Sequence, residues 1–307
     1  MPTSPAVPSA ARDAILAWYA ANGRRLAFRS TSDPYAILVS EVIAQQTQAS
    51  RAAEHWRRFI ARFPSVTALA AASPADVQRA WQGLGYNRRA LALWRAARVI
   101  VDEHAGKIPD SVEGLEALPG VGPYTARAVA AIAFGRRAGA VDVNVRRVLG
   151  RMVVGDPGAS SVSAMQRLAD GAVPANRAAE WTHALMDIGA TLCRSREPRC
   201  PECPASRWCR FAAGVGALPG AAANDRPPRR ARPPFPSTTR WLRGRILDRL
   251  RAAPGDSWAT IEAPIGGHDA PRIHAAAESM AAEGLIEIES SARPGARRRL
   301  RARLATN

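Results

Sequence analysis

The chain of 307 residues is poor in lysine, in cysteine and in long apolar runs. Its one lysine is Lys107, and the other 42 of its 43 basic residues are arginines. No apolar run approaches the ~18 residues that a membrane-spanning helix needs. Near the N-terminus, no basic start is followed by an apolar stretch of the kind that marks a secretory leader. We therefore expect a cytoplasmic protein without a membrane partner.

Positive charge dominates what the chain does contain. The formal net charge is +17, from 43 basic and 26 acidic residues. Such an excess favours a polyanionic partner, most simply nucleic acid, although a proteome biased toward arginine would show part of the same excess. Apolar residues make up 47% of the chain, which is enough to bury a core and too much for a disordered chain.

Hydrophobic spacing predicts a mainly α fold between residues 11 and 211. Alanine-rich and leucine-rich stretches recur there at helical spacing, and Asp33-Pro34 and Ser73-Pro74 are typical helix starts. No segment of this region alternates like a strand.

The composition changes after residue 213. Residues 214–237 are rich in proline and arginine, which predicts an extended linker. Residues 238–307 contain two helical patterns, at 241–250 and 270–283, followed by an alternating segment at 285–289 and a possible returning strand at 297–303. This order predicts a small winged-helix-like α+β module.

The cysteines are concentrated in one short segment. Four thiols within 17 residues suit a metal centre far better than unrelated buried positions. An iron–sulfur cluster and a tetrahedral zinc ion are both compatible with such density. Zinc ribbons usually have two C-x-x-C pairs, whereas one is present here. The candidate ligands, separated by six, two and five residues, are Cys193, Cys200, Cys203 and Cys209.

A glycine-rich turn precedes one of the predicted helices. In Leu118-Pro119-Gly120-Val121-Gly122, the two glycines permit positive φ angles and bare backbone N–H groups. The helix that follows adds the positive end of its dipole. We expect Gly120 and Gly122 to form a phosphate site that does not read sequence.

Two carboxyl groups stand out from their surroundings. Glu41 is the one acid in the apolar stretch 34–47, so burial is expected to raise its pKa and keep it protonated. Asp142 precedes an apolar helical pattern, where a helix N-cap is the commonest role. A protonated and an ionised carboxyl together can cleave a glycosidic bond.

Residues 11–213 resemble the adenine DNA glycosylase (MutY) family of the helix-hairpin-helix, endonuclease III-like superfamily. The similar motifs are the cysteine spacing, the string L-P-G-V-G-x-Y-T-A, the string S-E-V-x-x-Q-Q-T-Q and Gly83-Leu84-Gly85-Tyr86. The resemblance implies a two-lobed helix-hairpin-helix fold, with a six-helix barrel lobe at about 30–136. A second lobe, from 1–29 and 137–213, would carry a [4Fe–4S] cluster on the four cysteines.

The resemblance also implies roles for individual residues. Glu41 would be the general acid and Asp142 the carboxylate that stabilises the sugar cation. Further positions follow by matching the family's motifs. They are Tyr124 and Asn144 as supports of the two carboxyl groups, Arg24, Phe28, Arg29 and Asp187 around the adenine, Gln46 and Tyr86 in the DNA stack, and Thr47, Gly120 and Gly122 in DNA binding.

The implied substrate is adenine opposite 8-oxoguanine or guanine in double-stranded DNA, flipped out of the helix by a monomeric enzyme. Tyr124 stands where bifunctional relatives carry a lysine, so we expect no strand cleavage. The alternative is a thymine or uracil mismatch glycosylase of the same fold, which lacks the equivalent of Glu41. A third reading is a non-enzymatic iron–sulfur DNA-binding regulator.

The chain also departs from the family. Phe28 replaces a usual tryptophan, Val143 a glycine and Asn87 a second tyrosine. About 70 residues follow the linker, too few for the Nudix-like domain of longer members. Because the module is rich in arginine, we expect it to bind the DNA backbone without reading bases.

Overall fold

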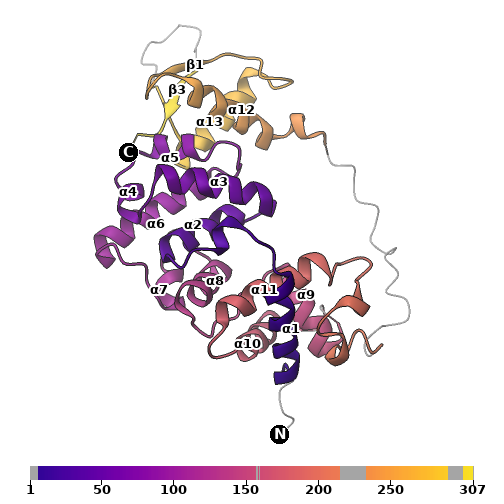
Figure 1. Cartoon of the computed structure of the whole chain (residues 1–307). Helices are drawn as coiled ribbons and strands as arrows, with labels where there is room; N and C mark the ends of the chain where they lie inside the picture. Colours follow the sequence, from indigo (N-terminus) through magenta and orange to yellow (C-terminus); the bar gives the residue numbers. More distant parts are fainter. Residues whose placement is uncertain (1–5, 157, 159, 215–232, 290–299, 307) are drawn as a thin grey trace. The chain divides into compact units, whose positions relative to one another are not determined.

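The computed structural model describes residues 6–156, 158, 160–214, 233–289 and 300–306 (Figure 1). Packing divides the chain into two units. The first comprises Met1–Trp56 and Lys107–Ala223, and the second comprises Arg57–Gly106 and Asn224–Asn307. The domain boundaries expected from the sequence remain a prediction. The linker residues 215–232 and the arginine-rich residues 293–299 lie outside the described part of the chain.

All regular elements in the described residues of the first unit are helices, as expected. Asp33 caps α2 by accepting hydrogen bonds from the backbone N–H groups of Tyr35 and Ala36. The helix α3, Ala49–Arg62, begins in this unit and ends in the second. The remaining helices of the unit are α1 Ser9–Asn22, α2 Pro34–Ala44, α7 Val112–Glu116, α8 Pro123–Phe134, α9 Val143–Leu149, α10 Val162–Ala172 and α11 Ala178–Thr191, with short helical turns at Ala27–Arg29, Gly150–Val154, Cys200–Glu202 and Ser206–Trp208.

One apolar core holds α1, α9, α10 and α11 together. Ile15 of α1, Leu149 of α9 and Trp181 of α11 are fully buried in it. The partly buried cysteines 193, 203 and 209 pack against the same core. The segment that carries the cysteines is therefore anchored to the helices that carry Asp142 and Asp187.

The second unit combines three helices of the N-terminal region with the C-terminal module. Ser73 caps α5 by accepting a hydrogen bond from Asp76 N–H, as its position before Pro74 predicts. The elements are α4 Val66–Ala70, α5 Pro74–Ala80, α6 Arg88–His104, the 3₁₀ turn Phe235–Ser237, α12 Thr239–Ala252, β1 Ala259–Ile261, α13 Ala270–Ala282, β2 Ile286–Ile288 and β3 Leu300–Leu304.

The C-terminal module contains a three-stranded antiparallel sheet in the order β1-β3-β2. Leu300, Ala302 and Leu304 of β3 alternate with partly exposed arginines and are buried. Their apolar side chains pack with those of α12 and α13. The strands and these two helices lie together in Figure 1. The predicted fold class, mainly α with a small α+β module, is confirmed. The strand β1 was not predicted, because three residues are too short to show alternation.

Candidate active site

Glu41 lies buried in the middle of α2. Nine residues of this helix are buried, and Glu41 itself is 7% exposed. Tyr124 of α8 donates a hydrogen bond from its hydroxyl to Oε2 of Glu41, over 3.1 Å. Burial raises the pKa of Glu41 to about 7 and the charge of Asp142 adds to this rise, while Tyr124 and Arg29 oppose it. Near neutral pH the carboxyl group can therefore hold a proton.

Asp142 caps the N-terminus of α9. Its Oδ1 accepts hydrogen bonds from the backbone N–H groups of Asn144 at 2.9 Å and Val145 at 2.7 Å. Its Oδ2 accepts a third from the Asn144 side-chain amide, at 2.8 Å. Both oxygens of the carboxylate are thus engaged at the start of the helix. The predicted N-cap role is confirmed.

The side chain of Asn144 is itself held by an arginine. Arg147 donates to Oδ1 of Asn144 at 2.8 Å, to the carbonyl of Gly189 at 2.6 Å and to the carbonyl of Cys193 at 2.5 Å. A Cβ atom at Gly189 would lie 2.5 Å from the Asn144 Cβ atom, so only glycine fits there. Arg147 thus joins the surroundings of Asp142 to the cysteine segment.

Arg147 was not among the predicted site residues. Asn144, Arg147 and Arg151 follow each other at helical spacings of three and four, so they share one face. This spacing from Asn144, a predicted site residue, is the signal by which the sequence could have revealed Arg147.

Asp187 of α11 is fully buried between two arginines. Arg29 donates to both carboxylate oxygens, at 2.8 and 2.9 Å, and Arg24 donates from its backbone N–H at 2.8 Å and from its Nε at 2.7 Å. Burial alone raises the pKa of Asp187, but the hydrogen bonds and charge of Arg29, together with Arg24, lower it below its ordinary value. Three predicted pocket residues therefore form one ionic group.

His183, one turn before Asp187 on α11, is a further buried polar residue that the sequence did not reveal. Burial, aided by the charge of Arg29, lowers the pKa of His183 to about 3. Its ring lies 6.3 Å from that of Tyr19, and its Nδ1 has no hydrogen-bond partner among the described residues. A neutral imidazole therefore lies beside the Arg29–Asp187 pair.

Three other predicted residues lie on loops of the first unit. Phe28 is in the turn Ala27–Arg29, and its ring meets that of Trp56 edge to face at 6.4 Å. Gln46 follows α2 with a φ of 55° and is exposed. Thr47 donates from its hydroxyl to the carbonyl of Gln45, at 3.3 Å.

The glycines of the turn before α8 differ from each other. Gly120 has a φ of 75°, as expected. Gly122 does not adopt the positive φ that a glycine permits, since it is the N-cap of α8 with a φ of −93°. A Cβ atom at Gly122 would meet nothing within 4 Å. Contacts inside the described protein therefore do not require a glycine at 122.

Tyr86 is the one predicted site residue that belongs to the second unit. It is 43% exposed and has a φ of 46°, which is rare for a residue with a side chain.

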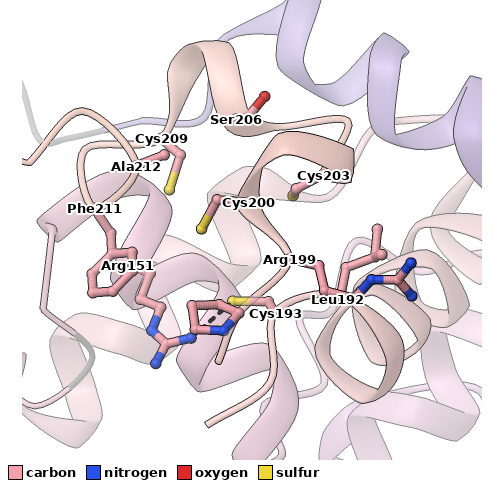
Figure 2. A pocket seen from close by; sticks show the side chains of 11 residues that line it. Arg151, Leu192, Cys193, Arg199, Cys200, Cys203, Ser206, Cys209, Phe211 and Ala212 are labelled. Atoms are coloured by element: carbon pink, nitrogen blue, oxygen red, sulfur yellow. Dashed lines mark hydrogen bonds between the residues drawn. The ribbon is translucent and has the colours of Figure 1, made fainter. Parts of the chain in front are cut away.

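The four cysteines line one small cavity, with Arg151 and Phe211 also at its wall (Figure 2). Burial raises the pKa of the Cys203 thiol to about 11, and the other three thiols contribute to the rise. Arg151 donates to Sγ of Cys193 at 3.5 Å. Backbone N–H groups also point at two sulfurs, from Ala205 to Cys203 and from Phe211 and Ala212 to Cys209.

This donor set fits an iron–sulfur cluster. Sulfur ligands that accept N–H hydrogen bonds in a partly buried site are typical of such clusters. Among the described residues, no group of three or more His, Cys, Asp or Glu side chains is arranged to hold a single metal ion. The four thiols line one common cavity.

Comparison with known proteins gives a consistent result. Residues 39–172 match the model of the family described as HhH-GPD superfamily base excision DNA repair protein. The adenine DNA glycosylase of Mycobacterium tuberculosis (strain CDC 1551 / Oshkosh) is 45% identical over 243 residues, which cover 78% of this chain and 78% of that relative. The adenine DNA glycosylase of Mycolicibacterium smegmatis is 38% identical over 281 residues, which cover 91% of this chain and 93% of the relative.

In the described part of the chain, no helix is both long and apolar enough to cross a membrane.

A solved structure of a thermostable thymine-DNA glycosylase has a TM-score of 0.62 at 29% identity, covering 66% of this chain and 95% of that one. Identity of 45% and 38%, over 78% and 93% of the two relatives, shows that the chain belongs to the adenine DNA glycosylase family of the HhH-GPD superfamily.

Proposed function

We propose that the chain is a base excision repair enzyme that removes adenine mispaired with 8-oxoguanine or guanine in double-stranded DNA. One observation carries the proposal. Glu41 is buried with a pKa raised to about 7, and the charge of Asp142, which caps the N-terminus of α9, acts on it. The first can give up a proton and the second can hold a negative charge, which is what cleavage of an N-glycosidic bond requires.

In the proposed reaction, the glycosidic bond breaks and its electrons go to the adenine, which takes the proton of Glu41. The sugar is left as an oxocarbenium ion, whose charge the Asp142 carboxylate stabilises from its capped position. Tyr124 and Asn144 keep the two carboxyl groups in place through the hydrogen bonds at 3.1 and 2.8 Å. Addition of water to the sugar completes the hydrolysis.

The product is an abasic site in an intact strand. Strand cleavage by this fold needs an amine that attacks the sugar, and the chain has a single lysine. Lys107 follows α6, whose last residue is His104, and lies before α7. Tyr124 occupies the position of the amine and its hydroxyl is engaged with Glu41.

The other predicted site residues contact either the flipped adenine or the rest of the DNA. Arg24, Arg29 and Asp187, with Phe28 nearby in sequence, bound the pocket for the flipped adenine. Gly122 lies at the start of α8 with open space at its Cβ position, which supports close approach of a phosphate to the backbone. Further contacts to DNA come from Gln46, Thr47, Gly120 and Tyr86.

A [4Fe–4S] cluster is the proposed cofactor, held by the four thiolates of residues 193, 200, 203 and 209. Its iron ions would supply the positive charge that keeps these thiols deprotonated. The exposed arginines of the same segment would then face a phosphate backbone. The enzyme acts as a monomer, in the cytoplasm where bacterial DNA lies.

The second candidate is removal of thymine or uracil from mismatches, which the likeness to a thymine-DNA glycosylase favours. The position of Glu41 argues against it. A buried acid with a raised pKa is suited to protonate adenine on a ring nitrogen, and the mismatch thymine glycosylases of this fold lack it.

Single-turnover release of base from A:8-oxoguanine, A:G, T:G and U:G duplexes tests the proposal. We expect adenine release from the first two duplexes, with an intact strand. Glu41→Gln keeps the shape but removes the proton donor, so release should fall about 10²–10⁴-fold while duplex affinity stays within about tenfold. Glu54→Gln, a change at an exposed residue of α3, is the control. Release at the normal rate by Glu41→Gln, or release of thymine in preference to adenine, would refute the proposal.

A further inference from the structure

The turn that carries Tyr86 is built to hold its side chain outward. Gly83, Gly85 and Tyr86 have φ angles of 89°, 67° and 46°. The carbonyl of Gly85 accepts hydrogen bonds from Trp81 at 3.1 Å and from Arg89 at 3.4 Å. Tyr86 is one of four large apolar side chains that stand out as exposed in the described chain. Sparsely populated backbone conformations often occur at functional sites, so the exposed ring of Tyr86 is a candidate functional group.

The C-terminal module supplies the closest partner of this ring. The guanidinium carbon of Arg240, in the first turn of α12, lies 4.1 Å from the centroid of the Tyr86 ring. The same guanidinium donates to the Tyr86 hydroxyl at 2.9 Å. The arginine thus fixes the ring by stacking and by a hydrogen bond, although 154 residues separate them.

A second arginine of α12 holds the other end of the turn. Arg251 is eleven residues after Arg240, about three helical turns, so both lie on one face of α12. Arg251 donates to Oδ1 of Asn87 at 2.6 Å and to the carbonyl of Gln78 at 3.0 Å. Asn87 stands where the family usually has a second tyrosine, so this departure provides the partner for Arg251.

The module is packed onto the helices that flank the turn. Gln78 of α5 is fully buried and donates to the carbonyl of Leu285 at 2.9 Å. Leu91 of α6 shares an apolar core with Leu242 and Ile246 of α12. Because this core would be exposed if the module moved away, α12 keeps a fixed position against the turn within this unit.

Arg240 also differs from other arginines of the module in its charge balance. Arg243, Arg301 and Arg303 each pair with a glutamate of the module. Among the described residues, Arg240 contacts the ring and hydroxyl of Tyr86 and the ring of Phe235, and no acidic side chain of that part of the chain forms an ion pair with it. A positive charge stacked on an exposed aromatic ring suits an unstacked nucleobase and its phosphate.

We propose that Arg240 is a positioning residue that holds Tyr86 ready to enter the base stack, so that the C-terminal module takes part in mismatch recognition. The inference rests on the proposed function, in which Tyr86 enters the DNA near the lesion. It also changes the expectation for the module. The part that the structure describes acts on a base-contacting side chain as well as on the backbone.

A double-mutant cycle in the full chain tests this coupling. Arg240→Ala, Tyr86→Ala and the double variant are compared for affinity to an A:8-oxoguanine duplex and to the matched duplex. We expect Arg240→Ala to reduce the ratio of the two affinities about tenfold, and to have no further effect on that ratio in the Tyr86→Ala background. Arg245→Ala is the control, since Arg245 is on the same helix and pairs with Asp248 at 2.6 Å. It should change the ratio less than twofold.

Two milder variants keep the test valid if Arg240→Ala does not fold. Arg240→Lys preserves the charge but not the planar stacking, so we expect it to restore less than half of the lost discrimination. Tyr86→Phe removes only the hydroxyl and should lose about threefold. Spectra and melting curves of all variants verify folding.

The outcomes separate this inference from the proposed function. Equal losses on matched and mismatched DNA, additive with Tyr86→Ala, would refute it and leave Arg240 as a phosphate contact. Full discrimination by Arg240→Ala would refute it as well. Failure of the unmodified protein to release adenine would instead refute the proposed function, while the binding ratio would still report whether Arg240 acts through Tyr86.

Discussion

Glu41 and Asp187 are both buried in the same unit, but their surroundings shift their pKa values in opposite directions. Glu41 is surrounded by apolar side chains of α2 and, among the described residues, its side chain accepts one hydrogen bond, from Tyr124 of α8. Around Asp187, two arginines provide four hydrogen bonds. Burial penalises the charge of both groups, so the partners decide which of them is ionised.

Arg29 connects the two regions. Its charge acts on both carboxyl groups, yet its planar fork is engaged with both oxygens of Asp187. The charge of Arg29 lowers the pKa of Glu41 and, with its hydrogen bonds, lowers that of Asp187. Burial outweighs this charge at Glu41, whereas the hydrogen bonds and charges of the two arginines outweigh burial at Asp187.

The largest effect should come from breaking the ionic group. Arg29→Met leaves the Asp187 carboxylate buried with Arg24 as its remaining cationic partner. Removing one partner of a buried pair costs about 3–5 kcal/mol, so urea unfolding at pH 7 should show a loss of that order. Arg25→Met, a change at the exposed neighbour of Arg24, is the control and should cost less than about 0.5 kcal/mol. A loss below about 1 kcal/mol in Arg29→Met would show that the pair does not stabilise the fold.

A smaller effect should appear in the pH dependence of stability. The pKa of Glu41 rises from 4.5 to about 7 in the folded protein, so the folded state binds a proton more tightly than the unfolded state. The stabilisation from this proton is complete below pH 4.5 and is lost as pH rises to 7. Over this window, Glu41→Gln should gain stability relative to the unchanged protein by up to about 3 kcal/mol.

Urea unfolding of both proteins at pH 4.5, 6, 7 and 8 measures the difference. Glu54→Gln, at an exposed site, should show no such trend. A gain that is the same at every pH would mean that the folded and unfolded states bind the Glu41 proton equally well.

Local patterns predicted much of the fold and part of the site. Asp33, Ser73 and Asp142 were predicted as helix caps from their places before apolar helical runs, and all three accept the capping hydrogen bonds. The raised pKa of Glu41 was predicted from the apolar stretch around it. Such features depend on neighbours within one turn of helix, which the sequence displays directly.

Two contacts between distant segments were not predicted. Arg147 reaches Cys193 across 46 residues, and Gln78 reaches Leu285 across 207. Each is an arginine or glutamine on a helix, which by pattern alone is expected to face solvent. Helical spacing shows that Asn144 and Arg147 share a face, but it does not show a partner that is reached only after the helices have packed. The roles of the site residues stay predictions.

The smallest expected effect concerns the one hydrogen bond that Glu41 accepts from Tyr124. This bond lowers the pKa of Glu41, so Tyr124→Phe should raise that pKa further. The difference between the pKa values of Glu41 and Asp187 should then increase. The falling alkaline limb of the single-turnover rate should then move to higher pH by up to about one unit, while the rate at pH 6 changes less than about threefold. Tyr35→Phe removes a buried hydroxyl from α2, the helix that carries Glu41, and should leave the limb in place. A limb that moves to lower pH would mean that the Tyr124 hydroxyl stabilises the protonated acid. The hydroxyl would then accept a hydrogen bond from the Glu41 carboxyl group instead of donating one to it.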